Sequence, residues 1–441
     1  KKKSISNGYK MTHNIHGTFI SEKINKIRWR PNPFDDSNSF ITGSWDNDKN
    51  SIKLWDFQAG DDDADIYPYT ICSYPFEGDV TECQFLSSEN FVASSSDGSM
   101  EKINKIRWRP NPFDDSNSFI TGSWDNDKNS IKLWDFQAGD DDADIYPYTI
   151  CSYPFEGDVT ECQFLSSENF VASSSDGSIF LLKVHVDERG CISIYDEIAW
   201  DKLHKFKNGD ISPCTSFAAY DNDIITVGED GCIHLLTALK RNVVRKIDEA
   251  DSCSLKAVIF LKYNEILTGN LRGQMKIWDL RSKENVPSST FMLSGDQITV
   301  TCLAYHPTQR HMVVAGDEDG SLTVWDLRQN TYPVNLLSAH AECVSELQFH
   351  PTYPDQLFSC SSAGELWHWT VNKQNKLLLD EDNVDQNLWI MGDSIKNKLE
   401  VYTLMPNLHK PINSLDLNRN RVLCGCDSEA IYLINNVNIY N

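Results

Sequence analysis

The 441-residue sequence lacks the features of a membrane-spanning or secreted protein. No apolar run reaches the ~18–20 residues that cross a bilayer, and the opening KKKSISNGYK holds no apolar core of a secretory signal. No cysteine pair has CxxC spacing, and no Asn-x-Ser/Thr acceptor occurs. Because the 13 cysteines are also an odd number, we expect a reducing intracellular compartment, with most thiols acting as small buried apolar groups.

Basic residues are scarce, since 40 Lys and Arg face 64 Asp and Glu, for a formal net charge of −24. This charge has the wrong sign for a chain that wraps nucleic acid or lies on an anionic membrane. We therefore expect no direct nucleic-acid partner and no membrane insertion. The apolar share of 40% is that of an ordinary globular protein.

The signature motifs of common enzymes are missing as well. The sequence contains no GxxxxGK phosphate loop, no GxSxG nucleophile elbow and no HExxH metal motif. We expect no enzymatic activity, no catalytic, cofactor-binding or metal-binding residues, and no cofactor.

Three groups of residues could suggest metal binding, but a structural role explains each of them better. The acidic run 61–65, repeated at 140–144, lacks the spaced ligands, central Gly and terminal Glu of a calcium loop, so we expect a solvated loop. Cys424 and Cys426 face one side of a strand with no further Cys or His nearby, which favours buried thiols. His306-Pro307 and His350-Pro351 follow strands in different repeats, which favours roles in turns.

One segment of the chain is an unchanged copy of another. Residues 22–99 recur at 101–178 without a single difference. Old internal repeats keep a pattern and lose identity, so a perfect copy of 78 residues indicates a recent duplication or an artefact of gene assembly.

A second, degenerate repeat extends along the whole chain. Each unit has an alternating strand, a strand rich in small residues, a turn that often reads Asp-Gly, and a strand that often ends in Trp-Asp. The turn glycines Gly177, Gly231, Gly273, Gly320 and Gly364 are spaced by 54, 42, 47 and 44 residues. The Asp-Gly pairs predict type I′ hairpins. The units are WD repeats, each of which forms one four-stranded blade of a β-propeller.

Counting the repeats predicts an all-β fold, a seven-bladed WD40 β-propeller with a surplus duplicated segment. We expect the ring to occupy residues 101–441, with blades from about Ile103 to Asn435 and a polar, irregular insertion at 372–408. The copy at 22–100 is expected to form a surplus of about one and a half blades on the N-terminal side, because Met100-Glu101-Lys102 cannot replace the strand Ile179–Val184. Residues 1–21 are an N-terminal tail, and the strand Thr18–Ile24 is a candidate for closing the ring.

His340, Ser359 and Trp369 resemble parts of the internal hydrogen-bond relay of WD repeats. Ala363 stands at the turn position where that relay has Asp, and most other units lack the His. We therefore expect an incomplete relay and a ring that depends on apolar packing between blades.

An ordered set of motifs resembles one family closely. IRWRP (106–110), TGSWDN (121–126), GQMKIWDLR (273–281), DGSLTVWDLR (319–328) and CGCDSEAIY (424–432) are similar to the nucleoporin 43 family, WD-repeat subunits of the Y-shaped scaffold of the nuclear pore. The resemblance implies a scaffold subunit at the nuclear rim that docks on other Y-complex nucleoporins, in particular an α-helical short-arm subunit. It also implies support of pore assembly and of mRNA and protein transport, and a link to kinetochores in mitosis.

Two WDxR boxes keep an alternative open. Arg281 and Arg328 end Trp-Asp-Leu-Arg motifs. Substrate receptors of cullin-RING ubiquitin ligases carry similar boxes, with which they bind the propeller adaptor of the ligase. The structural reading is that Trp packs between blades while Asp-Leu-Arg ends the strand. These two arginines are the candidate partner-binding residues if the protein is a ligase receptor. If it is a scaffold subunit, the sequence assigns no partner-binding residue.

Overall fold

The computed structural model divides the chain into two compact units, residues 1–100 (unit 1) and residues 101–441 (unit 2). It describes residues 23–30, 39–45, 50–59, 66–76, 80–85, 91–95, 101–111, 117–126, 128–138, 145–187, 189–295, 297–371, 389, 399–405, 407–428, 430–435 and 437. Over this part of the chain no helix is long and apolar enough to span a membrane.

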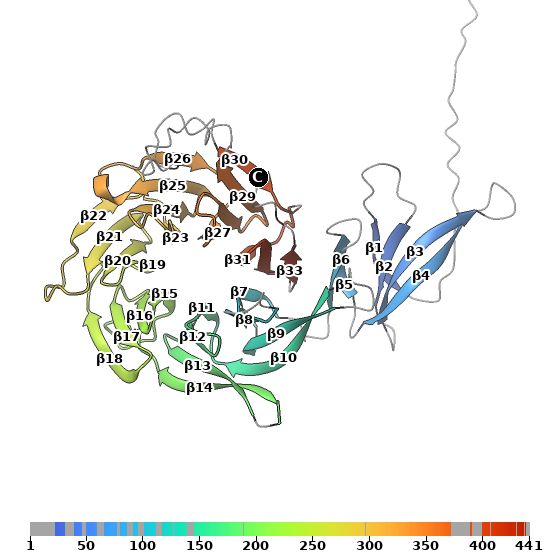
Figure 1. The fold of residues 1–441 in the computed structure, drawn as a ribbon, viewed down its shortest axis with the longest axis horizontal. Coiled ribbons are helices and arrows are strands. Elements are labelled where there is room, and N and C mark those ends of the chain that lie inside the picture. The colour runs from blue at the N-terminus through green and yellow to red at the C-terminus, as the bar shows by residue number, and fades with distance from the viewer. Residues whose placement is uncertain are drawn as a thin grey trace, which may run out of the picture. The chain divides into compact units, whose positions relative to one another are not determined.

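Unit 2 consists of antiparallel sheets that follow one another along the chain and surround a common centre (Figure 1). Sheet 1 comprises β7 (Ile103–Trp108), β8 (Phe119–Ser123), β9 (Asn129–Ala138) and β10 (Ile145–Phe155). Sheet 2 comprises β11 (Val159–Phe164), β12 (Asn169–Ser174), β13 (Ile179–Val186) and β14 (Ile192–Trp200). Sheet 3 comprises β15 (Cys214–Tyr220), β16 (Asp223–Gly228), β17 (Ile233–Thr237) and β18 (Lys240–Ile247). Sheet 4 comprises β19 (Leu255–Lys262), β20 (Glu265–Asn270), β21 (Gln274–Asp279) and β22 (Ser289–Met292).

The remaining sheets of unit 2 repeat this order. Sheet 5 comprises β23 (Val300–Tyr305), β24 (Met312–Asp317), β25 (Ser321–Asp326) and β26 (Asn335–Ser338), with the 3-10 helix η1 (Leu327–Gln329) after β25. Sheet 6 comprises β27 (Val344–Phe349), β28 (Leu357–Ser361), β29 (Leu366–Val371) and β30 (Leu399–Thr403). Sheet 7 comprises β31 (Ile412–Asn418), β32 (Arg421–Cys426) and β33 (Ile431–Ile434). The first strand of each sheet lies nearest the centre (Figure 1).

Unit 1 contains the first copy, folded into one complete sheet and part of another. The complete sheet comprises β1 (Ile24–Trp29), β2 (Ser39–Ser44), β3 (Asn50–Ala59) and β4 (Ile66–Phe76), and the partial one comprises β5 (Val80–Phe85) and β6 (Phe91–Ser95). The proposed closing strand Thr18–Ile24 lies outside the described residues except at its end, where Ile24 begins β1 and pairs with Ser44 of β2.

The predicted type I′ hairpins are wrong in geometry. Gly177 has a φ of 81°, but Asp176 does not share the positive φ that a type I′ turn requires. Ser174 N–H bonds Ser178 C=O at 2.9 Å and Gly177 N–H bonds Ser174 C=O at 3.1 Å, so the loop is longer, with Gly at its last, left-handed position. A Cβ on Gly177 would lie 2.5 Å from the carbonyl oxygen of Ser212 in the next loop, so glycine also allows close approach.

A β-bulge occurs at the start of the inner strand in every sheet of unit 2, and the extra residue links neighbouring sheets. In β7 the register shifts between Ile103 and Lys105, which leaves Asn104 unpaired in the ladder. Its side chain donates to the Val159 carbonyl of sheet 2 at 2.6 Å. Thr215 and Thr301, at the same position of sheets 3 and 5, donate to the first carbonyl of the following sheet at 2.6 and 2.7 Å.

The same link joins the last sheet to the first. Asn413 Nδ2 of β31 donates to the Ile103 carbonyl at 2.9 Å. The main-chain N–H of Trp108 donates to Asp416 Oδ2 at 2.7 Å, and Trp124 Nε1 to Asp427 Oδ1 at 3.0 Å. Sheet 7 therefore packs on sheet 1, and the seven sheets of unit 2 form a closed series.

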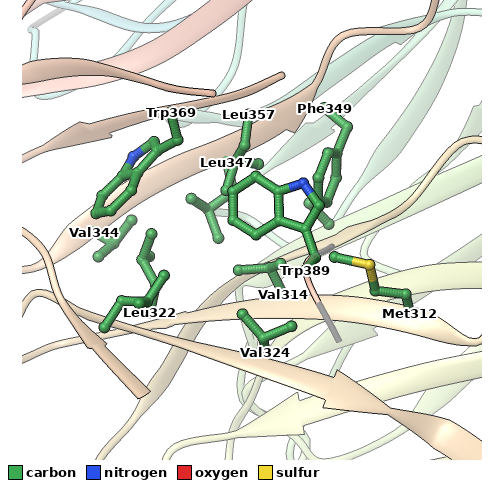
Figure 2. Packing of buried hydrophobic residues seen from close by; sticks show 12 residues of the cluster. Met312, Val314, Leu322, Val324, Val344, Leu347, Phe349, Leu357, Trp369 and Trp389 are labelled. Carbon is green, nitrogen blue, oxygen red and sulfur yellow. The ribbon is translucent and has the colours of Figure 1, made fainter. Parts of the chain in front are cut away.

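The core consists of apolar clusters between successive sheets. One cluster joins sheets 5 and 6 and includes Val324, Phe349 and Trp369 (Figure 2). Trp389 is fully buried in this cluster, with its ring edge-on to Phe349 at 5.8 Å between centroids.

This cluster corrects the expectation of a polar, irregular insertion at 372–408. Trp389 belongs to the core, and Leu399–Thr403 form β30, the fourth strand of sheet 6. The described end of this segment, Leu399–Thr403, thus completes sheet 6 as its outer strand.

Candidate functional site

The inner strands of all seven sheets line a central cavity of about 480 Å³. The third and fifth residues of these strands contribute much of the lining, which includes Lys105, Arg107, Glu161, Glu346 and Asp416. A ring built mainly from apolar clusters therefore has a charged centre.

Arg107 is the hub of this charged centre. Its Nη2 donates to Glu161 Oε1 of sheet 2 at 2.6 Å and to Glu346 Oε1 of sheet 6 at 2.5 Å. Its Nη1 donates to Ser414 Oγ of sheet 7 at 2.8 Å. Lys105 Nζ adds a second cation 3.2 Å from Glu161 Oε2. One guanidinium on sheet 1 thus connects three other sheets.

The pKa values of two carboxyls in this cluster, Glu346 and Asp416, shift in opposite directions. Burial alone would raise the pKa of Glu346, but the charges of Arg107 and Lys105 outweigh it and lower that pKa to about 2. Burial raises the pKa of Asp416, which has only the weaker field of Arg107 and hydrogen bonds from Trp108, Gln348 and Leu417 to offset it. Glu346 is therefore held ionised by its cationic neighbours, whereas burial favours the protonated form of Asp416.

The WD relay of sheet 6 is complete, contrary to the sequence-based expectation. His340 Nε2 lies 2.7 Å from Ser359 Oγ, and Trp369 Nε1 donates to the same oxygen at 2.9 Å. His340 Nδ1 lies 3.0 Å from Glu365 Oε2. The carboxylate comes from Glu365, two residues after Ala363, because the longer Glu side chain spans the extra distance.

Sheet 3 contains a second relay that the sequence did not reveal. His204 Nδ1 lies 3.0 Å from Asp230 Oδ1, and its Nε2 lies 2.9 Å from Thr226 Oγ1. Burial raises the pKa of Asp230, but the hydrogen bond and charge of His204 outweigh this and lower it below its usual range. In sheet 4 Asp251 replaces the His and pairs with Lys276 Nζ at 2.8 Å. Polar links thus supplement apolar packing more than predicted.

The two WDxR arginines lie on neighbouring sheets at the same end of the ring. Arg281 follows β21 and Arg328 follows β25, and their side chains are 71% and 62% exposed. Each folds back on the Asp of its own motif, with Nη2 2.8 Å from Asp279 Oδ2 and 2.7 Å from Asp326 Oδ2. The hydrogen bonds from Arg281 hold the pKa of Asp279 at about 2.

The remaining candidates have structural roles in the part of the chain that the structure describes. Cys424 and Cys426 are fully buried free thiols. His350 Nδ1 accepts from the N–H groups of Thr352 and Tyr353 at 3.2 and 3.0 Å, and His306 Nδ1 accepts from Gln309 N–H at 3.2 Å. Within that part no three His, Cys, Asp or Glu side chains form a metal-ligand group. The acidic runs 61–65 and 140–144 lie outside the described residues.

Arg107, Glu161 and Glu346 were not predicted, although the sequence carries a signal for them. VTECQF and VSELQF place Glu161 and Glu346 at the same position of their inner strands, and INKIRW places Lys105 there in sheet 1. Charged residues at one inner position of several repeats indicate a charged channel, but their pairing needs the geometry of the closed ring.

The series of four-stranded sheets and the sequence together define a WD40 β-propeller. The family model "WD domain, G-beta repeat" matches residues 149–181 and 286–326. Human "Nucleoporin Nup43" is 38% identical over 368 residues, which cover 76% of this chain and 96% of the relative. "Nuclear pore complex protein nup43" of Dictyostelium discoideum is 24% identical, with 76% and 97% coverage. The chain belongs to the Nup43 family of WD-repeat nucleoporins.

Proposed function

We propose that the protein is a non-enzymatic scaffold subunit of the nuclear pore complex that acts within its Y-shaped assembly. Its kinship with nuclear pore proteins over 96% or more of the length of the human and Dictyostelium relatives is the observation that carries this proposal. Its partners would be other nucleoporins of the assembly, in particular an α-helical subunit of the short arm. The proposal includes support of pore assembly and of mRNA and protein transport, localisation at the nuclear rim, and a mitotic role at kinetochores.

The construction of the ring supports a binding role. Side-chain links between successive sheets and the Arg107 hub hold the inner strands together, so the loops at both ends rest on a rigid base. Rigid, preorganised loops lose little conformational entropy when a partner binds.

The test is localisation and capture of the tagged full-length chain. We expect a signal at the nuclear rim in interphase, at kinetochores in mitosis, and Y-complex nucleoporins among the captured proteins. Absence of the rim signal together with absence of these nucleoporins would reject the scaffold role. A rim signal without kinetochore signal would remove only the mitotic part.

A second candidate function is that of a substrate receptor for a cullin-RING ubiquitin ligase. The exposure of Arg281 and Arg328 on neighbouring sheets favours it. Changing both arginines to Ala should abolish binding of the ligase adaptor while the ring stays folded, and unchanged adaptor binding would reject this function.

We also propose that the working propeller is residues 101–441 and that residues 22–100 are a surplus copy from duplication or gene assembly. The separate unit formed by residues 1–100 and the 24% of the chain beyond the matched 76% support this proposal. Transcript reads across Ser99-Met100-Glu101 test it. Reads that span this junction at the level of neighbouring junctions would show that the copy is expressed.

A further inference from the structure

The two ends of the ring differ in charge over sheets 3 to 5. In each sheet the connection from first to second strand and the connection from third to fourth strand lie at the same end, because the strands are antiparallel and in sequence order. We call this end of sheets 3 to 5 the basic rim. Its exposed charged residues, counted in the loops and two flanking residues on each side, include two acids, Asp221 and Glu284, and the following six bases: Lys240, Arg241, Lys262, Arg281, Lys283 and Arg328.

The opposite end of the same three sheets has more exposed acids than exposed bases. By the same count, with the connection from β14 to β15 included, the described residues there include five exposed bases, Lys202, Lys205, Lys207, Lys246 and Arg272, and the following seven exposed acids: Asp201, Asp210, Asp248, Glu249, Glu318, Asp319 and Glu342. Three less exposed acids also lie on the basic rim, where Glu265, Asp279 and Asp326 pair with Lys262, Arg281 and Arg328. Lys240, Arg241 and Lys283 are the cations of the rim outside these pairs, in a chain of net charge −24.

Apolar side chains are exposed on the same rim. The most exposed large apolar residues described in unit 2 are Leu239, Tyr263, Val286 and Tyr332, with between 63% and 78% of each in contact with solvent. All four lie in the loops of the basic rim, one or two on each of the three sheets. Large apolar residues gathered on one face mark interaction sites in soluble proteins, and Tyr and Arg are the side chains enriched at the centre of protein interfaces.

The rim is fixed in place by bonds between sheets. Arg245 Nη1 of β18 donates to the Leu280 carbonyl of sheet 4 at 2.8 Å, and Asn330 Nδ2 of sheet 5 donates to Ser289 Oγ of sheet 4 at 2.6 Å. Nearer the centre, the Arg310 guanidinium lies over the ring of Tyr220 at 5.3 Å. The ring of Tyr220 lies 6.1 Å from that of Tyr263. The exposed groups are therefore presented by a preorganised surface.

We propose that the basic rim binds an acidic amphipathic helix of the helical nucleoporin that docks on this protein. Most of the rim consists of loops, and its exposed charged and apolar side chains are the groups that a partner would contact. A helix fits this requirement because it presents an apolar stripe flanked by charges along one face. Carboxylates beside the stripe would meet Lys240, Arg241 and Lys283 and would add to the existing pairs of Lys262, Arg281 and Arg328. The stripe would cover the exposed apolar side chains Leu239, Tyr263, Val286 and Tyr332. This inference rests on the proposed function, since it names the surface used within it.

The charge of the partner is tested by a carbodiimide, which joins a lysine amine directly to a carboxylate, on the complex captured with the full-length chain. We expect links from Lys240, Lys262 or Lys283 to Asp or Glu of a helical segment of one nucleoporin. Lys202 and Lys207, on the opposite end of the ring, are the controls, and Lys207 is 82% exposed at its side chain. Links to a nucleoporin from these two lysines, with none from the rim, would overturn the proposal.

The apolar part is tested by a matched pair of variants in the full-length chain. Val286→Glu with Tyr332→Glu places two carboxylates on the rim and should reduce capture of that nucleoporin at least 10-fold. Ile211→Glu with Leu271→Glu makes the same change in exposed residues of the opposite end and should leave capture within 2-fold. Equal capture by both pairs, or loss with the second pair alone, would overturn the rim as the docking site.

Two further outcomes separate the rim from the scaffold role. If the unchanged protein captures no nucleoporin, the proposed function itself fails before any variant is compared. If it captures nucleoporins and the rim pair instead loses only a ubiquitin-ligase adaptor, the scaffold role stands and the rim serves another partner, which overturns this proposal.

Discussion

The two identical copies are a controlled comparison between a blade inside a ring and the same residues outside it. Ile106 is fully buried and Trp108 is 6% exposed, whereas their twins Ile27 and Trp29 are 58% and 62% exposed. The sequence within the copies is the same, so the difference comes from the neighbour: sheet 7 packs on β7 of unit 2, through Ser414 and Asp416.

The contacts made inside each copy are nearly unchanged. Phe40 stacks on Trp55 at 6.1 Å between centroids, and Phe119 on Trp134 at 6.2 Å. Asn25 Nδ2 donates to the Val80 carbonyl at 2.8 Å, and Asn104 Nδ2 to the Val159 carbonyl at 2.6 Å. A blade therefore folds by its own pattern, and the ring adds burial of the face that the pattern leaves open.

Deleting one copy cannot show which of the two belongs to the ring. Removing residues 22–100 or residues 100–178 produces the same sequence, because the copies are identical. Point substitutions are needed, and each copy supplies the matched control for the other.

The largest expected difference is at Trp108. Trp108→Ala should lower the free energy of unfolding of the ring by about 4 kcal/mol, because it opens a cavity against Phe119 and removes the surface on which Arg421 lies. Trp29→Ala should change it by less than about 0.5 kcal/mol. Denaturant-dependent hydrogen exchange of peptides beyond Ile179, which occur once in the chain, reports on the ring alone. A large loss with Trp29→Ala and a small one with Trp108→Ala would show that the ring uses the first copy, and equal losses would show that it depends on both.

The hub of the channel gives the next largest effect. Arg107→Ala should destabilise the ring by about 3 kcal/mol, since Glu161 and Glu346 would stay buried without their shared cation. Arg28→Ala, the same change in the first copy, should leave exchange of the ring peptides unaltered. If Arg28→Ala also destabilised the ring, the assignment of the hub to the second copy would be wrong.

The acid sensitivity of the ring follows from the same hub. The pKa of Glu346 is about 2 in the folded ring against an ordinary 4.5. A depressed pKa contributes stability that is present above 4.5 and is lost as the pH falls toward 2, by a total of the order of 3 kcal/mol. The raised pKa of Asp416 acts with the opposite sign, so the test is the difference between the unchanged chain and Glu346→Gln. We expect a shallower loss of stability in the variant over this pH range, and parallel curves would refute the role of Glu346.

The sequence predicted the local features of each blade but not the contacts between distant sheets of the ring. Alternation, small-residue strands and turn glycines predicted the strands, because these patterns are local. The bonds of Arg107 join residues 54 and 239 positions apart, and no local pattern specifies such a pairing. Trp389 was missed since its short apolar run, LWIM at 388–391, lies within a polar stretch and shows no alternation. Glu365 was missed since it stands two residues from the expected turn position.

The smallest expected effect is one that should be equal in the two copies. Trp55 Nε1 donates to Thr42 Oγ1 at 2.8 Å, and Trp134 Nε1 donates to Thr121 Oγ1 at the same distance. Thr42→Val and Thr121→Val each replace a buried acceptor by a methyl group of similar size. Each should cost its own unit about 1 kcal/mol, because a buried indole N–H is left without its partner while packing is kept.

The measurement for this last pair is hydrogen exchange of the peptide that carries each substitution, since the added methyl makes the peptide of one copy distinguishable from its twin by mass. Thr121→Val should also lower the protection of peptides beyond Ile179, because its blade is part of the ring, whereas Thr42→Val should not. Equal local costs with unequal effects on the ring would separate the two levels of the fold: hydrogen bonds that a blade makes by itself, and contacts that it acquires from its neighbours. A local cost in Thr121→Val several times that in Thr42→Val would show instead that closure of the ring strengthens the bonds within a blade.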